Sequence, residues 1–214
     1  AFMSVDGPTN YGIFLGLLLP VGSGGREVAQ FHICCLWLGS GLGKVGPWFC
    51  NVNGTFICGS YWFKSWPWLW RLMYKGEDDL RPTLFAEVLG HFAAAVEWGS
   101  PLVLLFSKDS FWIGFAVFAL VSMHVYIIML VPNDLLVWNA SCAVAAIYLW
   151  LCEQPISFDW NAWCSLPWYF QAFGASQICL FLLGSFFPHL IDYTMAHRHW
   201  AGNSRQGQPA VRRG

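Results

Sequence analysis

LFAEVLGHFAAAVEWGSPLVLLF, residues 84–106, is the stretch that decides the fold. It is long enough to cross about 30 Å of hydrocarbon as a helix. Further apolar runs of comparable length lie at residues 111–131, 135–152 and 167–191. Backbone polar groups must be paired inside a bilayer, and none of these runs alternates like a barrel strand. The pattern therefore predicts an all-α integral membrane helical bundle of about four to six membrane helices.

The composition of the chain agrees with a membrane protein. Charged residues make up 11% of the 214 residues and hydrophobic residues 57%, and the mean hydropathy is +0.48. A soluble domain carries about 25% charged residues. The net charge of -1 excludes a strong general attraction to nucleic acid.

The N-terminal part gives a weaker signal. Residues 27–43 could cross the membrane, although Gln30, His32 and three glycines interrupt the apolar pattern. Whether residues 11–43 form one membrane helix or two stays open. No basic n-region or cleavage pattern follows Ala1, so we expect a processed or truncated product.

The distribution of cations predicts an orientation. Lys and Arg gather in the connection at residues 44–83 and again near the C-terminus, whereas the segment at 153–166 is acidic. The positive-inside rule then places the 44–83 connection and the tail on the non-translocated side. We expect residues 1–199 to form one transmembrane domain and residues 200–214 a polar, mobile tail.

Two glycosylation sequons, at Asn53 and Asn139, fit this arrangement. Asn53 lies on the side expected to be non-translocated, and Asn139 lies within a span. We therefore expect both asparagines to stay unmodified.

The connection contains YWFKSWPWLWRLMYKGEDDLRP at residues 61–82, in which aromatic rings alternate with cations. Such rings could stack on nucleic-acid bases, clamp a flat cofactor or lie in the lipid headgroup layer. Tryptophan rings prefer that layer, and Lys and Arg there reach phosphates. We expect a short interfacial helix or pair of turns, with a clamp as the lesser alternative. The predicted membrane anchors are Trp62, Lys64, Trp66, Trp68, Trp70 and Arg71.

Ionisable and amide side chains within the predicted spans are the candidate site. They are Glu87, His91, Glu97, His124 and Asn139. Three interpretations remain open. The side chains could hydrogen-bond to one another and hold the helices together; His91 or His124 could be an axial ligand to chlorophyll or, less favoured, haem; or Glu97 could act with His91 in proton transfer.

The cysteines and the remaining histidines give little chemical signal. Most cysteines lie in apolar runs, and a disulfide between Cys50 and Cys58 is one open possibility. His189, Asp192, His197 and His199 cluster near the C-terminus without a metal-ligand spacing, which favours a cationic rim facing headgroups. No metal site is predicted.

The segments DDLRPTLFAEVLGHFAAAVEWGSPLVLLFS and SMHVYIIMLVPNDLLVWNA carry a resemblance. Over about residues 2–150 the chain resembles the second half of an uncharacterised multi-span transmembrane family found in actinobacteria, distantly similar to HTTM and DoxX-like membrane proteins. The resemblance implies a helical membrane bundle. HTTM relatives include a carboxylase of glutamate side chains, but this chain lacks the accessory domains, so that reaction is not carried over.

Two functional hypotheses follow. The first is a non-catalytic integral subunit of a larger membrane complex, with other membrane subunits and lipids as partners. Its most concrete form is an accessory subunit of an algal photosystem I-like complex in the chloroplast thylakoid, in contact with chlorophyll and carotenoid. The second is a membrane enzyme or a lipid- or quinone-handling protein that uses Glu97, His91 and His124 in an intramembrane pocket.

Overall fold

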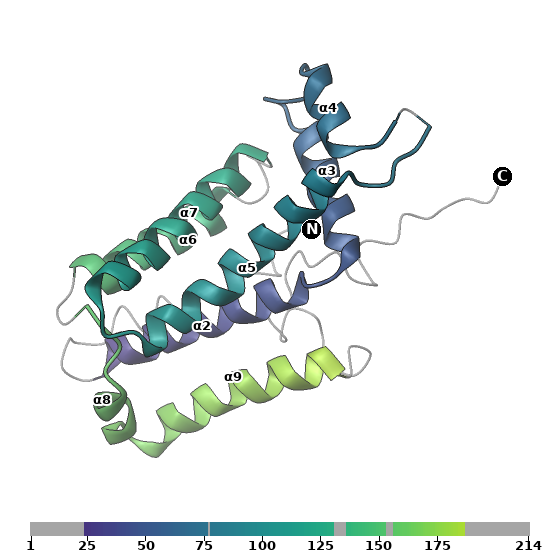
Figure 1. The fold of residues 1–214 in the computed structure, drawn as a ribbon. Coiled ribbons are helices and arrows are strands. Elements are labelled where there is room, and N and C mark those ends of the chain that lie inside the picture. The colour runs from purple at the N-terminus through teal and green to yellow at the C-terminus, as the bar shows by residue number, and fades with distance from the viewer. Residues whose placement is uncertain (1–23, 77, 131–135, 153–155, 187–214) are drawn as a thin grey trace.

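The computed structural model describes residues 24–76, 78–130, 136–152 and 156–186, which fold as a bundle of helices with no β-strand in these ranges. Figure 1 shows α2, α5, α6 and α9 running side by side. The helices in chain order are α2 (Gly25–Gly43), α3 (Pro47–Gly59), α4 (Pro67–Met73), α5 (Leu84–Phe106), α6 (Ser110–Leu130), α7 (Leu136–Ile147), the π-helix η1 (Tyr148–Cys152), α8 (Trp160–Ser165) and α9 (Trp168–Phe186). The prediction of an all-α fold is confirmed.

The α5–α6 hairpin supplies the two described helices that are long and apolar enough to cross a membrane. The side chain of Thr83 accepts a hydrogen bond from the backbone N–H of Ala86 and so caps α5. A short turn joins the helices, and the carboxylate of Asp109 accepts the N–H of Phe111 at 2.8 Å where α6 begins. The observed bounds agree with the predicted spans at 84–106 and 111–131.

Helices α2 and α3 together form a broken helix that runs antiparallel along α5. Gly41 of α2 packs on the backbone of Trp98, and Gly90 of α5 packs on Cys50 of α3. The chain between α2 and α3 turns at Lys44–Gly46, and Pro47 is suited to the first turn of α3 because that turn needs no N–H from it. Within the predicted connection at residues 44–83, residues 47–59 are a helix packed along α5, and the interfacial position of the connection stays a prediction.

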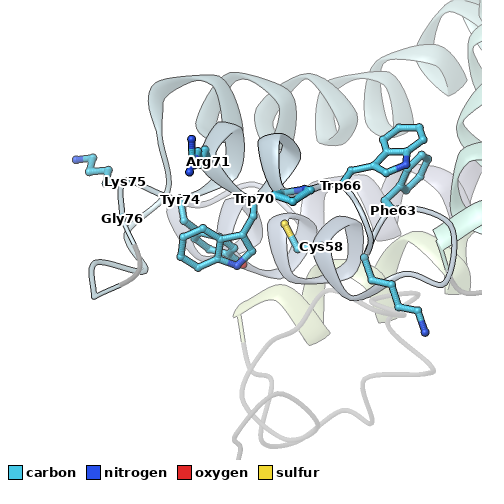
Figure 2. A pocket seen from close by; sticks show the side chains of 10 residues that line it. Cys58, Phe63, Trp66, Trp70, Arg71, Tyr74, Lys75 and Gly76 are labelled. Carbon is cyan, nitrogen blue, oxygen red and sulfur yellow. The ribbon is translucent and has the colours of Figure 1, made fainter.

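Helix α4 lies beyond the start of α5 and is held there by backbone hydrogen bonds. The N–H of Thr83 donates to the carbonyl of Met73 at 3.0 Å, and Lys75 N–H donates to Arg81 O at 3.2 Å. The expected short helix is therefore present over Pro67–Met73, and its place in the lipid interface stays a prediction. Aromatic rings from this segment stand around an open pocket (Figure 2).

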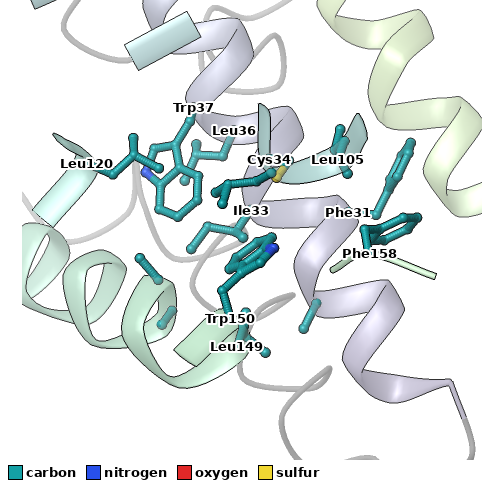
Figure 3. Close-up of a cluster of buried hydrophobic side chains, with 14 of the residues drawn as sticks. Phe31, Ile33, Cys34, Leu36, Trp37, Leu105, Leu120, Leu149, Trp150 and Phe158 are labelled. Carbon is teal, nitrogen blue, oxygen red and sulfur yellow. The ribbon is translucent and has the colours of Figure 1, made fainter. Parts of the chain in front are cut away.

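Helix α2 is the central helix of the bundle, because 14 of its 19 residues are buried. The largest side chains of the core are Trp37 from α2, Trp150 from η1 and Phe158 from the segment before α8 (Figure 3). The rings of Trp37 and Trp150 lie 6.3 Å apart. A helix that is buried on all sides has no polar face toward lipid, so its polar side chains must find partners inside the protein.

Helices α8 and α9 cover the remaining side of α2. The ring of Phe31 stacks on that of Trp163 with centroids 4.4 Å apart, and His32 stacks on Phe173 at 5.6 Å. The carboxylate of Asp159 caps α8 by accepting the N–H groups of Asn161 and Ala162. The span predicted at 167–191 is described as α9 up to Phe186. The C-terminal histidine cluster and the predicted mobile tail at 200–214 lie outside the described residues.

Candidate functional site

A buried ion pair lies at the break between α2 and α3. The ammonium of Lys44, directly after α2, contacts the carboxylate of Glu97 on α5. Lys44 is 7% exposed and Glu97 5% exposed. Removing two opposite charges from water is costly, and ionisable side chains at membrane depth mark functional sites more often than other positions do. Glu97 was predicted from the sequence as a site residue, whereas Lys44 was counted only among the cations of the 44–83 connection and its burial was not predicted.

A small apolar cavity, which we call the break cavity, adjoins this ion pair. It has a volume of about 70 Å³ and is lined by Lys44, Phe49, Asn53, Phe56, Ala93, Glu97, Met123, Tyr126, Ile127 and Leu130. The hydroxyl of Tyr126 donates to Asn53 Oδ1 at 3.0 Å. The polar wall of the cavity holds N–H donors on Lys44 and Asn53 and the Glu97 carboxylate as an acceptor.

The second polar centre is a chain of three buried side chains. Trp37 Nε1 donates to His124 Nε2 at 2.9 Å, and His124 Nδ1 lies 2.8 Å from Asn139 Oδ1. An indole N–H can only donate, so His124 Nε2 accepts and Nδ1 carries the proton given to Asn139. The imidazole is thus a neutral tautomer that joins α2, α6 and α7. His124 and Asn139 were both predicted, but Trp37 was not.

The structure separates the three ionisable residues that the sequence groups on one face of α5. Glu97 belongs to the buried stripe of that helix, whereas Glu87 and His91 are exposed on its outer surface. At about 100° per residue, the three positions spread over about 120° of the helix, which is wide enough to include both the buried stripe and the outer face. His91 therefore does not stand beside Glu97 as a proton partner in this arrangement.

The arrangement also bears on the predicted axial ligands. Both ring nitrogens of His124 are engaged in hydrogen bonds, so a metal could bind there only if one of these bonds were lost. His91 is exposed and remains the position where a ring pigment could approach from the lipid. Within the described residues, no group of three metal-ligating side chains is brought together.

A third polar cluster, not predicted from the sequence, lies toward the other end of α2. Gln30 Nε2 donates to the backbone carbonyl of Leu149 at 2.8 Å, and the guanidinium of Arg26 lies 3.4 Å from the same oxygen. Leu149 belongs to the π-helix η1, in which the usual i to i+4 bonding is interrupted and carbonyl groups become available. These contacts explain how a central helix can carry Gln30 and Arg26.

The predicted anchors have mixed exposure. Trp62, Trp66 and Trp68 are exposed, with Trp68 58% exposed, whereas Trp70 is half-buried. Lys64 and Arg71 are exposed beside them, so the assignment as membrane anchors stays a prediction that suits this placement.

Two further expectations concern single residues in the bundle. Asn53 is 4% exposed and hydrogen-bonded to Tyr126, so its side chain is closed to glycosylation in the folded protein. The thiols of Cys50 and Cys58 are free, so the structure has no disulfide at this pair.

Comparison with known proteins identifies one family. The model of a family described as "Transmembrane protein of unknown function (DUF3556)" matches residues 23–214. No curated protein and no solved structure matches the chain. The family match ends at residue 214, whereas the resemblance was predicted to end at about residue 150. It confirms a transmembrane family, while the actinobacterial and HTTM- or DoxX-like parts of the resemblance stay predictions.

Proposed function

The chain belongs to this family of transmembrane proteins of unknown function, and we propose that it is a lipid-handling membrane protein. In this proposal the break cavity binds a small head group that carries a carbonyl. The observation that carries the proposal is the Lys44–Glu97 ion pair in the wall of an otherwise apolar cavity beside a broken helix. Broken helices in membrane transporters commonly place their binding site at the interruption.

The polar residues in the wall of the break cavity favour a neutral head group. Lys44 and Glu97 neutralise each other, so a charged ligand would bring an unpaired charge into an apolar site. Lys44 and the Asn53 amide offer donors, which fit a neutral acceptor such as the carbonyl of an acyl ester.

The size of the cavity decides between a lipid ester and a quinone. A protein cavity of about 150 Å³ accommodates benzene, whereas the break cavity measures about 70 Å³. A quinone ring is therefore too large, and an ester carbonyl with its few neighbouring atoms is the better fit. Its acyl chain would extend into the bilayer.

Photolabelling tests this proposal. A monoacylglycerol ester with a diazirine in its chain should label residues of α3 and α6, detected by mass spectrometry of the full-length protein in nanodiscs. Asn53→Leu keeps the branching of the side chain but removes the amide donor, together with the acceptor of the Tyr126 hydroxyl, so labelling should fall on the order of tenfold or more, at least the loss of one hydrogen bond of about 1.4 kcal/mol.

Two controls make the result specific. The ether analogue of the probe lacks the carbonyl and should label as weakly as Asn53→Leu, and His91→Gln, on the outer face of α5, should leave ester labelling unchanged. Equal labelling by the ester and the ether would contradict the proposal.

A role as a subunit of a larger membrane complex is the second candidate. The aromatic side chains of Phe111, Trp112, Phe115 and Phe118 are exposed along α6, and such a row suits a neighbouring membrane subunit or a pigment. Within this candidate, the photosynthetic form with chlorophyll and carotenoid in a thylakoid has His91 as its most accessible ligand.

Absorption spectroscopy separates the second candidate from the first. Gently purified protein in its pigment-containing form should show chlorophyll bands that His91→Leu diminishes severalfold, because an axial imidazole is lost. Lys108→Gln serves as the control because it alters an exposed residue at the opposite end of α5 from His91 and leaves the hydrogen bonds of His124 intact. A colourless protein that migrates as a single chain would contradict this candidate.

A further inference from the structure

The pocket beside α4, which we call the interface pocket, has a chemistry that the break cavity lacks. Its volume is about 620 Å³, within the range of ligand-binding pockets. In Figure 2 two aromatic pairs, Phe63 with Trp66 and Trp70 with Tyr74, lie on either side of the Cys58 sulfur. The ring centroids lie 5.1 Å apart in the first pair and 5.2 Å apart in the second.

The charged residues that line this pocket are all cations. Lys64, Arg71 and Lys75 line it, and none of its described lining residues is acidic. All three cations are exposed, so they can reorient toward an anion at little cost. Within the described ranges, no ion pair involves any of the three.

The nearby acid Asp79 is already committed to another cation. Its carboxylate accepts hydrogen bonds from Arg81 at 2.6 and 2.8 Å. These bonds lower the pKa of Asp79 to about 2, so the carboxylate stays charged and paired at every physiological pH. Asp79 and Arg81 neutralise each other, which leaves the positive charge of the pocket uncompensated by this pair.

The position of the pocket indicates where its ligand comes from. The backbone bond from Thr83 to Met73 fixes α4 next to the first residue of α5, the point where that membrane span begins. Half-buried indoles and exposed cations at this depth are typical of the headgroup layer.

We propose that the interface pocket binds the phosphate-bearing headgroup of an anionic glycerophospholipid. The three cations would face the phosphate, and the aromatic pairs would lie against the glycerol and the first chain carbons. This inference is independent of the proposal for the break cavity, because the two sites share no residue.

Native mass spectrometry of the full-length protein tests the inference. The protein is equilibrated in detergent with equal amounts of phosphatidylglycerol and phosphatidylcholine, and the retained lipids are counted. The wild-type chain should retain phosphatidylglycerol preferentially. In the triple variant Lys64→Gln, Arg71→Gln, Lys75→Gln this preference should fall on the order of a hundredfold, because each cation near an anionic surface contributes roughly a factor of five.

Control variants test whether the charge of the pocket causes the preference, and inorganic phosphate tests whether the lipid itself is the ligand. The charge-conserving variant Lys64→Arg, Arg71→Lys, Lys75→Arg should keep the preference, and so should Lys108→Gln, which removes an exposed cation that does not line the pocket. A preference retained by the triple glutamine variant would overturn the inference. Displacement of phosphatidylglycerol by inorganic phosphate alone would also overturn it, because the ligand would then be free phosphate.

Discussion

Replacing Glu97 by alanine is expected to lower the free energy of unfolding by about 3–5 kcal/mol, the range for removing one partner of a buried ion pair. The change leaves the Lys44 ammonium 7% exposed with no counter-charge, in a cavity whose other walls are largely apolar. Detergent-titrated unfolding of the purified protein, followed by tryptophan fluorescence, measures the loss.

The double variant Lys44→Met, Glu97→Leu distinguishes two causes of this loss of stability, an uncompensated charge and poorer packing. Both charges are removed together and the volume is roughly kept, so most of the stability should return. If the double variant is as unstable as Glu97→Ala, the loss comes from packing at the break and not from an uncompensated charge.

Replacing Gly41 by alanine is expected to destabilise the bundle by about 1–3 kcal/mol, and Gly41→Val by more. A Cβ atom at position 41 would lie 2.5 Å from the backbone nitrogen of Trp98 and 2.8 Å from the carbonyl carbon of Glu97. Backbone atoms cannot rotate away, so α2 would have to move off α5. Thermal unfolding in detergent would show the effect as a lower midpoint.

The matched control is Gly114→Ala in α6, where a new Cβ would meet nothing within 4 Å. Alanine is a better helix former than glycine by about 1 kcal/mol, so this variant should be neutral or stabilising. Equal destabilisation by the two alanine variants would contradict close packing of α2 on α5 as the cause, because a Cβ at position 114 meets no neighbouring atom.

The helices that were predicted best from the sequence are those with a continuous apolar run. Helix α5 matched its predicted bounds because its apolar run begins directly after the capping residue Thr83. Helix α2 gave the weakest signal, since Gln30 and His32 lower its hydropathy, yet the protein itself surrounds it. Helix α3 was not predicted, because two asparagines and two glycines make PWFCNVNGTFICG resemble a loop.

In the Lys44–Glu97 and Trp37–His124 contacts, only the downstream residue was predicted from the sequence. Glu97 and His124 stood out as polar residues in apolar helices, but their partners Lys44 and Trp37 lie 53 and 87 positions earlier in the chain. A single sequence contains no record of such pairings. One signal was present nonetheless: Lys44 lies within GLGKVGP, where glycine and proline interrupt an apolar segment, and such an interruption can mark a broken membrane helix.

The burial of α2 constrains how the protein is made. Helix α2 leaves the ribosome before α5, α6 and η1, which hold the groups that satisfy Lys44, Trp37 and Gln30. Until those helices arrive, Lys44, Trp37 and Gln30 lack the partners that satisfy them in the folded protein. Stable packing of α2 therefore has to wait for the downstream helices, so the first described helix in the chain is among the last to settle into the bundle.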